Sequence, residues 1–431
     1  MQQKRVNHKN GRLIWNRLDN TANLFPVIAT KNMTNVYRIS VTLTDDIEPE
    51  KLQTAVEQVL EYFDVFQFCL KKGIFWYYFE TNKRPLPHIE EENLYPCTYI
   101  ERYENNEYLF RVSYYGKRIN LEVFHALTDG NGALAFLKEI TYMYLRMTHE
   151  ELADNVQDTL NKETSLDYED SYLNNYKRKA ARTYKTEKAV VIKGTKLSGD
   201  QFGVMHGYIP VAEIKKVAKS YDVTINQYLL AVYTWAIYVQ YLKKMAGKKP
   251  ITISVPVNLR PYFDSTTLKN FFVIVSSVFH PYKDDCTFEE ILAVVKESLE
   301  KQTTKENLEK LFSYNVSNEK TFMLRVVPLA IKKLAIKFVY LQSAHANTST
   351  VTNLGLIKVE EAYKKYIKQF HVVISMSEGQ NIKGTVISYD ETMVFTFSSY
   401  LENTSIQREF FRKLSEDGIN VSIETNGVYY E

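Results

Sequence analysis

A histidine, an aspartate and a glycine follow an apolar run near the end of the first third of this chain. Residues 121–132 read LEVFHALTDGNG and place His125, Asp129 and Gly130 in an H-x-x-x-D-G pattern. An imidazole at the mouth of a cleft accepts a proton from a hydroxyl or an amine near neutral pH. The pattern therefore predicts that His125 is a general base.

The alternative interpretation is a histidine held in the core, with the Asp-Gly pair only closing a turn. A chance occurrence of the pattern is expected on the order of once in a hundred chains of this composition. Its context favours the catalytic interpretation, because turn-forming residues follow the apolar run directly.

The elements around this motif place the histidine at a strand end. Residues 107–115 and 118–124 have the pattern of a hairpin, and the second strand runs straight into His125. Residues 132–147 then carry apolar side chains at helical spacing. Asp129 and Gly130 fall between strand and helix, where glycine permits a tight turn of the backbone.

The length of 431 residues is too great for one simple core and predicts two domains. We expect a first lobe over residues 1–175, a crossing linker over 176–200 and a second lobe over 201–431. Residues 150–194 are polar with weak periodicity, which is typical of a segment that crosses between domains.

The remaining pattern alternates strands and helices and predicts the α/β class, with antiparallel or mixed sheets. The expected further strands cover 35–43, 65–70, 74–80, 203–209, 250–257, 271–279, 348–359, 370–376, 384–390 and 393–400. The expected further helices cover 48–63, 225–245, 287–302, 322–341 and 405–416.

The helix expected at 322–341 has a lysine-rich face, and Pro328 should either kink it or mark its start. A helix lying on a membrane surface is the alternative interpretation of this segment. No run of about 18 uncharged apolar residues predicts a membrane span.

Bulk composition excludes several classes of function. Lys+Arg number 54 and Asp+Glu 51, so the net charge of +3 predicts no broad nucleic-acid-binding surface. Cys69, Cys97 and Cys286 are far apart and odd in number, which predicts neither disulfides nor a zinc site and favours a reducing compartment. The N-terminus is polar and lacks a signal peptide, so we expect a cytoplasmic protein. We also expect no bound metal. The 32 Tyr and 23 Phe fit either a large aromatic core or an aromatic-lined tunnel.

Three segments of the chain resemble the chloramphenicol acetyltransferase-like superfamily, which includes alcohol acetyltransferases, plant BAHD acyltransferases and the condensation domains of peptide synthetases. The first is FHALTDG, which resembles the family's H-x-x-x-D-G. The second is SVPVNLRPYFDSTTLKNFF at 254–272. It resembles the family's stretch in which a strand ends in a turn that contains an arginine and the next strand begins with Asn-Phe. The third is TNLG at 352–355, similar to the S-N-L-G turn of the alcohol acetyltransferases.

The resemblance implies two similar lobes, each a mixed sheet flanked by helices, with a channel between them. It implies transfer of an acyl group from acyl-CoA to a small alcohol or amine, with no bound cofactor and His125 as the base. Asp129 would be structural and would pair with Arg260, fixing the histidine loop beside Gly130. Asn258 and Asn270 would also be structural.

A tetrahedral intermediate needs a hydrogen-bond donor aimed at its oxyanion. The candidates are Thr352, Asn353 and Ser343, for which ordinary turn chemistry is the alternative interpretation. His345 lies in a Ser/Thr/Asn-rich loop with no apolar strand leading into it, so we expect a loop histidine there.

The chain departs from the family pattern at two places. Condensation domains carry a second histidine where this chain has Phe124, and the D-F-G-W-G motif of the plant enzymes is absent. These departures favour a stand-alone acyltransferase. Because two fused halves need no partner to form the cleft, we expect a monomer. Two alternatives stay open: a non-catalytic relative that binds an acyl or aromatic ligand, and a condensation enzyme that takes its thioester from an acyl carrier protein.

Overall fold

The computed structural model describes residues 15–19, 21–155, 171–177, 187–199, 201–320 and 327–429. Most of the expected crossing segment and the beginning of the helix expected at 322–341 therefore lie outside the described residues. Within them the chain forms an α/β fold with three sheets, which confirms the predicted class.

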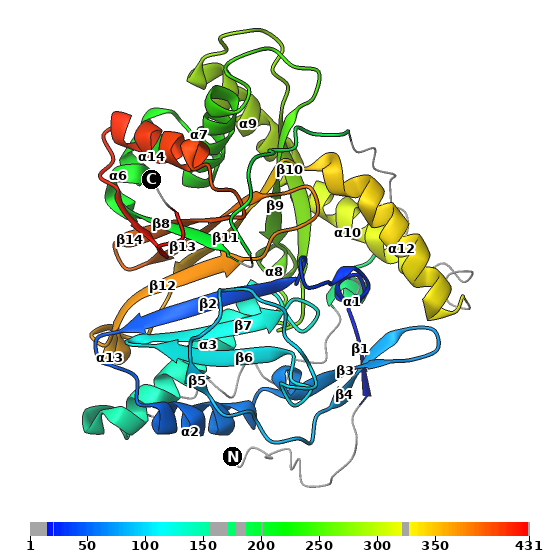
Figure 1. Cartoon of the computed structure of the whole chain (residues 1–431), viewed down its shortest axis with the longest axis vertical. Helices are drawn as coiled ribbons and strands as arrows, with labels where there is room; N and C mark the ends of the chain where they lie inside the picture. The colour runs from blue at the N-terminus through cyan, green and yellow to red at the C-terminus, as the bar shows by residue number, and fades with distance from the viewer. Residues whose placement is uncertain are drawn as a thin grey trace.

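A five-stranded sheet makes up the lower half of the molecule in Figure 1. One of its faces carries alternating apolar residues, among them Ile39 and Val41, and these pack under two helices. The helices are α2 (Pro49–Leu60) and α3 (Gly130–Thr148). The strands, in spatial order, are β12 (Ile367–Ile374), β2 (Val36–Leu43), β7 (Arg118–Phe124), β6 (Phe110–Tyr115) and β5 (Glu90–Glu91).

A seven-stranded mixed sheet makes up the upper half. It shares a second hydrophobic core with three helices, α7 (Ile225–Gln240), α9 (Phe288–Gln302) and α14 (Ser405–Glu416). The strands, in spatial order, are β10 (Phe272–Phe279), β9 (Ile251–Asn258), β11 (Ser349–Ile357), β13 (Ile382–Tyr389), β14 (Thr392–Ser399), β8 (Gly203–Pro210) and β15 (Ser422–Thr425).

One strand from late in the sequence belongs to the first sheet. β12 pairs antiparallel with β2, with His371 opposite Ser40, while the next strand, β13, lies in the second sheet. The chain therefore returns to the lower half after building much of the upper one. The expected lobe boundaries at 175 and 200 stay a prediction.

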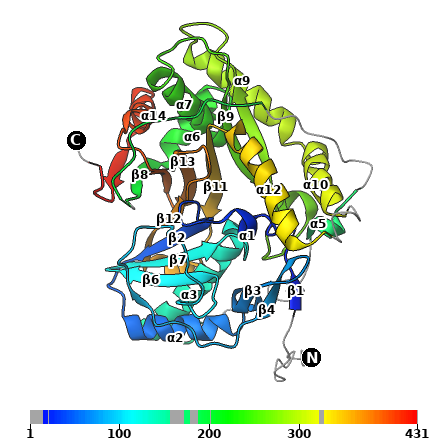
Figure 2. The same cartoon turned by 45° about the vertical axis from the view of Figure 1, so that its right-hand side comes forward.

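A small third sheet lies at the outer edge of the lower half, below α12 (Leu329–Ser343) in Figure 2. The residue before α12 is Pro328, so this proline marks the start of the helix, one of the two expected alternatives. The strands of the third sheet are β1 (Trp15–Arg17), β4 (Tyr77–Thr81) and β3 (Phe68–Lys72).

Helix α7 is buried nearly all round, and a capping box formed by Thr224 and Gln227 begins it. It ends at Gln240, earlier than the expected residue 245.

Several elements were not predicted, because they are short or carry a weak apolar stripe. They are α1 (Phe25–Ile28), η1 (Asp64–Gln67), η2 (Glu150–Leu152), α5 (Ser171–Asn174), α6 (Val211–Ser220), α8 (Arg260–Phe263), α10 (Lys305–Lys320), η5 (Ala344–Ala346), α13 (Glu361–Lys364), β1, β5 and β15.

Three tyrosines of α7, Tyr228, Tyr233 and Tyr238, are fully buried, so part of the aromatic surplus lies in the core. Among the described residues, none of the helices has the length and apolar character that crossing a bilayer requires.

Candidate active site

His125 directly follows β7 and lies where the two halves of the molecule meet. Its backbone N–H donates to the carbonyl of Asn35 at 2.9 Å, which continues the pairing of β7 with β2 by one residue. The residue is half-buried. Three aromatic rings surround the imidazole, with centroid separations of 4.6 Å to Phe25, 4.9 Å to Tyr37 and 5.7 Å to Phe272.

One side chain determines which ring nitrogen of His125 carries the hydrogen. Oδ1 of Asn270 lies 3.1 Å from Nδ1 of the imidazole. The amide nitrogen of Asn270 donates to Oδ2 of Asp19 at 3.0 Å and to the carbonyl of His125 at 3.3 Å. Turning the amide round would set its oxygen against the Asp19 carboxylate. Because Oδ1 only accepts, Nδ1 must donate, and the neutral ring then has its lone pair on Nε2.

Burial lowers the pKa of His125, because it disfavours the charged imidazolium. Hydrogen bonding to its own carbonyl, the charge of Asp129 and the contact with Asn270 oppose this effect, and the ammonium of Lys383 adds to it. Burial in turn lowers the pKa of Lys383 to about 7. The imidazole of His125 is therefore uncharged at neutral pH, which a general base requires.

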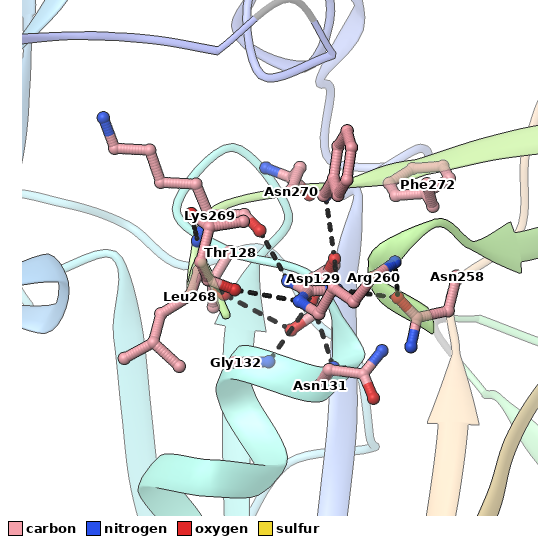
Figure 3. A network of polar contacts seen from close by, with 12 residues as sticks. Thr128, Asp129, Asn131, Gly132, Asn258, Arg260, Leu268, Lys269, Asn270 and Phe272 are labelled. Carbon is pink, nitrogen blue, oxygen red and sulfur yellow. Dashed lines mark hydrogen bonds and ion pairs between the residues drawn. The ribbon is translucent and has the colours of Figure 1, made fainter. Parts of the chain in front are cut away.

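The carboxylate of Asp129 binds Arg260, as Figure 3 shows. The two nitrogens Nη1 and Nη2 of Arg260 donate to the Asp129 carboxylate at 2.8 and 3.1 Å, and both side chains are largely buried. The carboxylate also caps α3 by accepting from the backbone of Asn131 and Gly132, and it accepts from Phe271 N at 3.0 Å. The expected bidentate pair is thus present, and it joins the two halves of the molecule.

Arg260 also holds the loop that leads to Asn270. Its Nε donates to the carbonyl of Thr267 at 2.8 Å and its Nη2 to the carbonyl of Lys269 at 2.7 Å. Thr128, just before Asp129, donates its hydroxyl to the carbonyl of Leu268. We call residues 264–270 the Arg260 loop; these bonds fix it against the start of α3, which places Asn270 beside His125.

Gly130 does not have the predicted role of permitting a tight turn. Gly130 is the first residue of α3 and has no positive φ, so it is not needed for a tight turn. A methyl group there would stand 2.6 Å from the end of the flexible Leu354 side chain. At Gly132 it would overlap the hydroxyl of Thr128 and stand 2.5 Å from the backbone oxygen of Leu268, to which that hydroxyl donates. The close packing of the Arg260 loop therefore requires glycine at 132 more strictly than at 130.

The oxyanion candidates lie in two places. Thr352 and Asn353 are half-buried on β11, next to Leu354, which packs on Gly130. Oδ1 of Asn353 accepts from Gly355 N at 2.7 Å across a bulge in β11. This contact uses the amide oxygen of Asn353 and not its amide nitrogen, which is the donor that an oxyanion would need.

Ser343, by contrast, ends α12 and bonds within its own helix, to the carbonyl of Tyr340. His345 was expected in a loop, but it lies in the short helix η5 that follows α12, close to Gly379. Within the described residues no recorded contact brings Ser343 or His345 to His125.

Three residues of the site were missed by sequence reasoning: Asp19, Phe25 and Tyr37. Asp19 is buried and accepts from Ala22 N at 2.7 Å as well as from Asn270. The phenol of Tyr37 donates to the carbonyl of Thr128 at 3.0 Å. Nothing in their local sequence separates these residues from ordinary turn and core positions.

A cavity of about 1510 Å³ lies in the described part of the molecule, and His125 is not among the residues that line it. Its lining includes His345. It also includes Met33 and Thr34, which come just before Asn35, the residue whose carbonyl accepts from His125. In the described part of the chain no group of three or more His, Cys, Asp or Glu side chains could hold a metal ion.

Solved structures with a similar fold cover nearly the whole chain. The trichothecene 15-O-acetyltransferase TRI3 from Fusarium sporotrichioides has 9% identity and a TM-score of 0.59, over 96% of this chain and 96% of its own. The epimerization domain from the third module of tyrocidine synthetase B has 10% identity and a TM-score of 0.59, over 96% and 98%. A starter condensation domain of rhizomide synthetase in complex with C8-CoA and Leu-SNAC has 9% identity and a TM-score of 0.59, over 95% of this chain and 97% of its own. No protein-family model matches the sequence, and no curated protein matches it. Identities this low establish the fold alone.

Proposed function

Because the chain has the two-lobed fold of the chloramphenicol acetyltransferase-like superfamily, we propose that it is an acyltransferase. It moves an acyl group from a thioester to a small alcohol or amine, with His125 as the general base. One observation carries this proposal: the bond between Asn270 and Nδ1 leaves Nε2 of an uncharged imidazole free to accept a proton.

In the proposed reaction, Nε2 of His125 takes the proton of the acceptor hydroxyl or amine as that group attacks the thioester carbonyl. The carbonyl oxygen becomes an oxyanion, which the amide of Asn353 or the hydroxyl of Thr352 stabilises by donating a hydrogen bond. When the intermediate collapses, the carbon–sulfur bond breaks and the imidazolium returns its proton to the departing thiolate. Asp129 and Arg260 act at a distance, by holding the histidine loop and Asn270.

We propose acyl-CoA as the donor, because one structure with this fold contains C8-CoA. An acyl carrier protein thioester is the alternative donor. We propose a monomer, because the two halves of this chain supply both sides of the site themselves. Three free, buried cysteines are consistent with a reducing compartment such as the cytoplasm.

The test is His125→Ala, assayed by release of free CoA thiol from a panel of acyl-CoA donors with alcohol and amine acceptors. We expect the variant to fold normally and to lose about 10²–10⁴-fold in turnover, because general base catalysis contributes that much. The matched control is His345→Ala, which removes a histidine outside the site and should keep full turnover. An active His125→Ala enzyme would contradict the mechanism.

The aromatic rings around His125 favour one second candidate, a non-catalytic protein that binds an acyl or aromatic ligand. It predicts ligand binding without thiol release from any donor. Running the same assay with acyl carrier protein thioesters separates the carrier-dependent enzyme from the CoA-dependent one.

A further inference from the structure

Helix α12 presents its apolar side to solvent. Ile331, Leu334 and Phe338 lie three and four residues apart, on one face of the helix, and are 58%, 73% and 62% exposed. Lys332, on the other side, is only 4% exposed. A surface helix of a globular protein normally turns its apolar stripe inward and its lysines outward. In α12 the apolar stripe faces outward and Lys332 inward, so within the described part of the chain the stripe is exposed to water.

The tip of the β3–β4 hairpin extends this apolar surface. Leu329 N donates to the carbonyl of Ile74 at 2.8 Å, and Nζ of Lys332 donates to the carbonyl of Phe75 at 3.0 Å. The buried lysine thus ties the helix to the hairpin. Ile74 is 76% exposed, and Phe75 is also exposed. Figure 1 shows α12 along the outer edge of the molecule with its lower end at this hairpin, and in Figure 2 the helix lies on the near side, with its lower end above the third sheet.

We call Ile74, Phe75, Ile331, Leu334 and Phe338 the apolar face. Two parts of the chain more than 250 residues apart supply it, and hydrogen bonds fix them to each other. Isolated exposed apolar residues are ordinary on protein surfaces, but a contiguous group of this kind marks an interaction site.

The charges around the apolar face are positive. Helix α12 has the sequence LAIKKLAIKFVYLQS, which contains three lysines and no acidic residue. Lys333 and Lys337 lie one turn apart beside the stripe, with the ammonium of Lys333 over the Tyr77 ring, and Lys72 ends the strand that leads to the hairpin tip. Large apolar side chains with lysines at their border match a surface that is apolar inside and anionic outside, as a bilayer with acidic headgroups is.

We propose that the apolar face docks this protein on the surface of a membrane that contains anionic lipids. The side chains of the apolar face enter the boundary between headgroups and acyl chains, and the bordering lysines contact the headgroups. Helix α12 also supplies Lys337, Tyr340 and Leu341 to the wall of the 1510 Å³ cavity, so the cavity lies beside the docked side of the molecule. This proposal goes beyond the acyltransferase function and does not depend on it.

The experiment is flotation of the full chain with vesicles of phosphatidylcholine alone and of phosphatidylcholine with phosphatidylglycerol. We expect binding to the anionic vesicles that weakens as salt rises, because screening reduces the lysine contribution. The double variant Leu334→Glu/Phe338→Glu should lower the bound fraction by about tenfold or more, since it places two carboxylates against acidic headgroups. Lys333→Gln/Lys337→Gln should weaken binding and flatten its dependence on salt.

Ile423→Glu is the matched control, because Ile423 is an apolar residue of β15 that is 48% exposed and outside the apolar face. It should bind vesicles like the unmodified chain. His125→Ala should also bind normally, which separates docking from catalysis. Absence of vesicle binding, or equal binding by the Leu334→Glu/Phe338→Glu variant, would overturn the proposal. Self-association that this double variant abolishes, without vesicle binding, would assign the face to a second copy of the chain and also overturn it.

Discussion

At His125, the assignment of the base rests on one hydrogen bond and on the electrostatics around it. The oxygen of Asn270 accepts from Nδ1, and the amide of Asn270 is itself held by Asp19. Asn270 is therefore a positioning residue, since it fixes the orientation of the ring and the nitrogen that reacts.

Asn270→Ala tests this role through the pH profile of kcat/KM. In the unmodified enzyme we expect the acid limb below the ordinary imidazole value of about 6.5, because burial lowers the pKa of His125. Removing Asn270 removes a contact that raises this pKa, so the limb should move to still lower pH while the plateau falls by about tenfold or more. Asn420→Ala, a substitution on the exposed surface, is the control. An unchanged acid limb would show that Asn270 has only a packing role.

The sequence predicted those residues of the site that lie in a local motif. His125 and Asp129 could be assigned because strand end, turn and helix start are all encoded within a dozen residues. Arg260 came from the resemblance. Asp19 could not be predicted, because its contact with Asn270 joins positions 251 residues apart and depends on how the two halves meet.

Among the elements, the start of α3 and the Arg260 loop form one unit, held by the buried pair of Asp129 and Arg260. The carboxylate caps the helix, and the guanidinium binds two carbonyls of the loop. A lysine cannot reproduce this geometry, because one ammonium lacks the fork of donors that reaches the carboxylate and both carbonyls at once.

Asp129→Ala and Arg260→Lys should therefore both destabilise the fold and lower activity. Breaking a buried ion pair leaves one charge unpaired and costs about 3–5 kcal/mol. We expect Asp129→Ala near that range, measured as a lower midpoint of urea unfolding at an unchanged slope, and Arg260→Lys to recover little of the Arg260→Ala loss. As a control, Lys364→Ala, which breaks an exposed ion pair with Glu361, should leave the urea midpoint nearly unchanged, because water screens such a pair. Full stability of Asp129→Ala would disprove the anchoring role.

Elements with strong periodicity were predicted close to their bounds. Helix α9 begins after Thr287, as its capping residues indicate, and β7 ends at Phe124 as expected. Helix α6 was missed, because it is short and the residue before it is a proline rather than a capping side chain. The placement of β12 in the first sheet was also beyond prediction, since alternation shows that a segment is a strand and not which strand it pairs with.

At the scale of the whole molecule, two histidines lie where the two large sheets pack together. His371 of β12 and His206 of β8 have ring centroids 4.6 Å apart. Nε2 of His371 lies 3.0 Å from the Tyr208 hydroxyl, which donates to Glu424, so Nε2 is the donor in that contact. Nδ1 of His371 is buried without a hydrogen-bond partner. This interface accommodates a neutral imidazole and has no acceptor in place for a second N–H.

The packing of the two sheets should therefore weaken in mild acid. Burial, with the nearby charge of Arg118, lowers the pKa of His371 to about 4, and burial with the charge of His371 lowers the pKa of His206. A histidine whose pKa is lower in the folded than in the unfolded state binds fewer protons when folded. Its contribution to stability is present above the unfolded value near 6.5 and is lost as pH falls toward about 4.

His371→Gln isolates this contribution from that of the carboxylates, which also titrate in acid. Between pH 7.5 and 4.5 the unmodified chain should lose more unfolding free energy than the variant, by up to about 3 kcal/mol for the shift of this one group. Urea unfolding of both chains at pH 7.5, 6.0 and 4.5 measures the difference. His149→Gln is the control, because His149 lies away from the interface of the two sheets, beside Asp45 and Tyr366. The prediction requires that the two sheets enclose a neutral ring. If the unmodified chain and the His371→Gln chain lose equal unfolding free energy in acid, the prediction is wrong, because the interface must then open enough to hydrate the imidazolium.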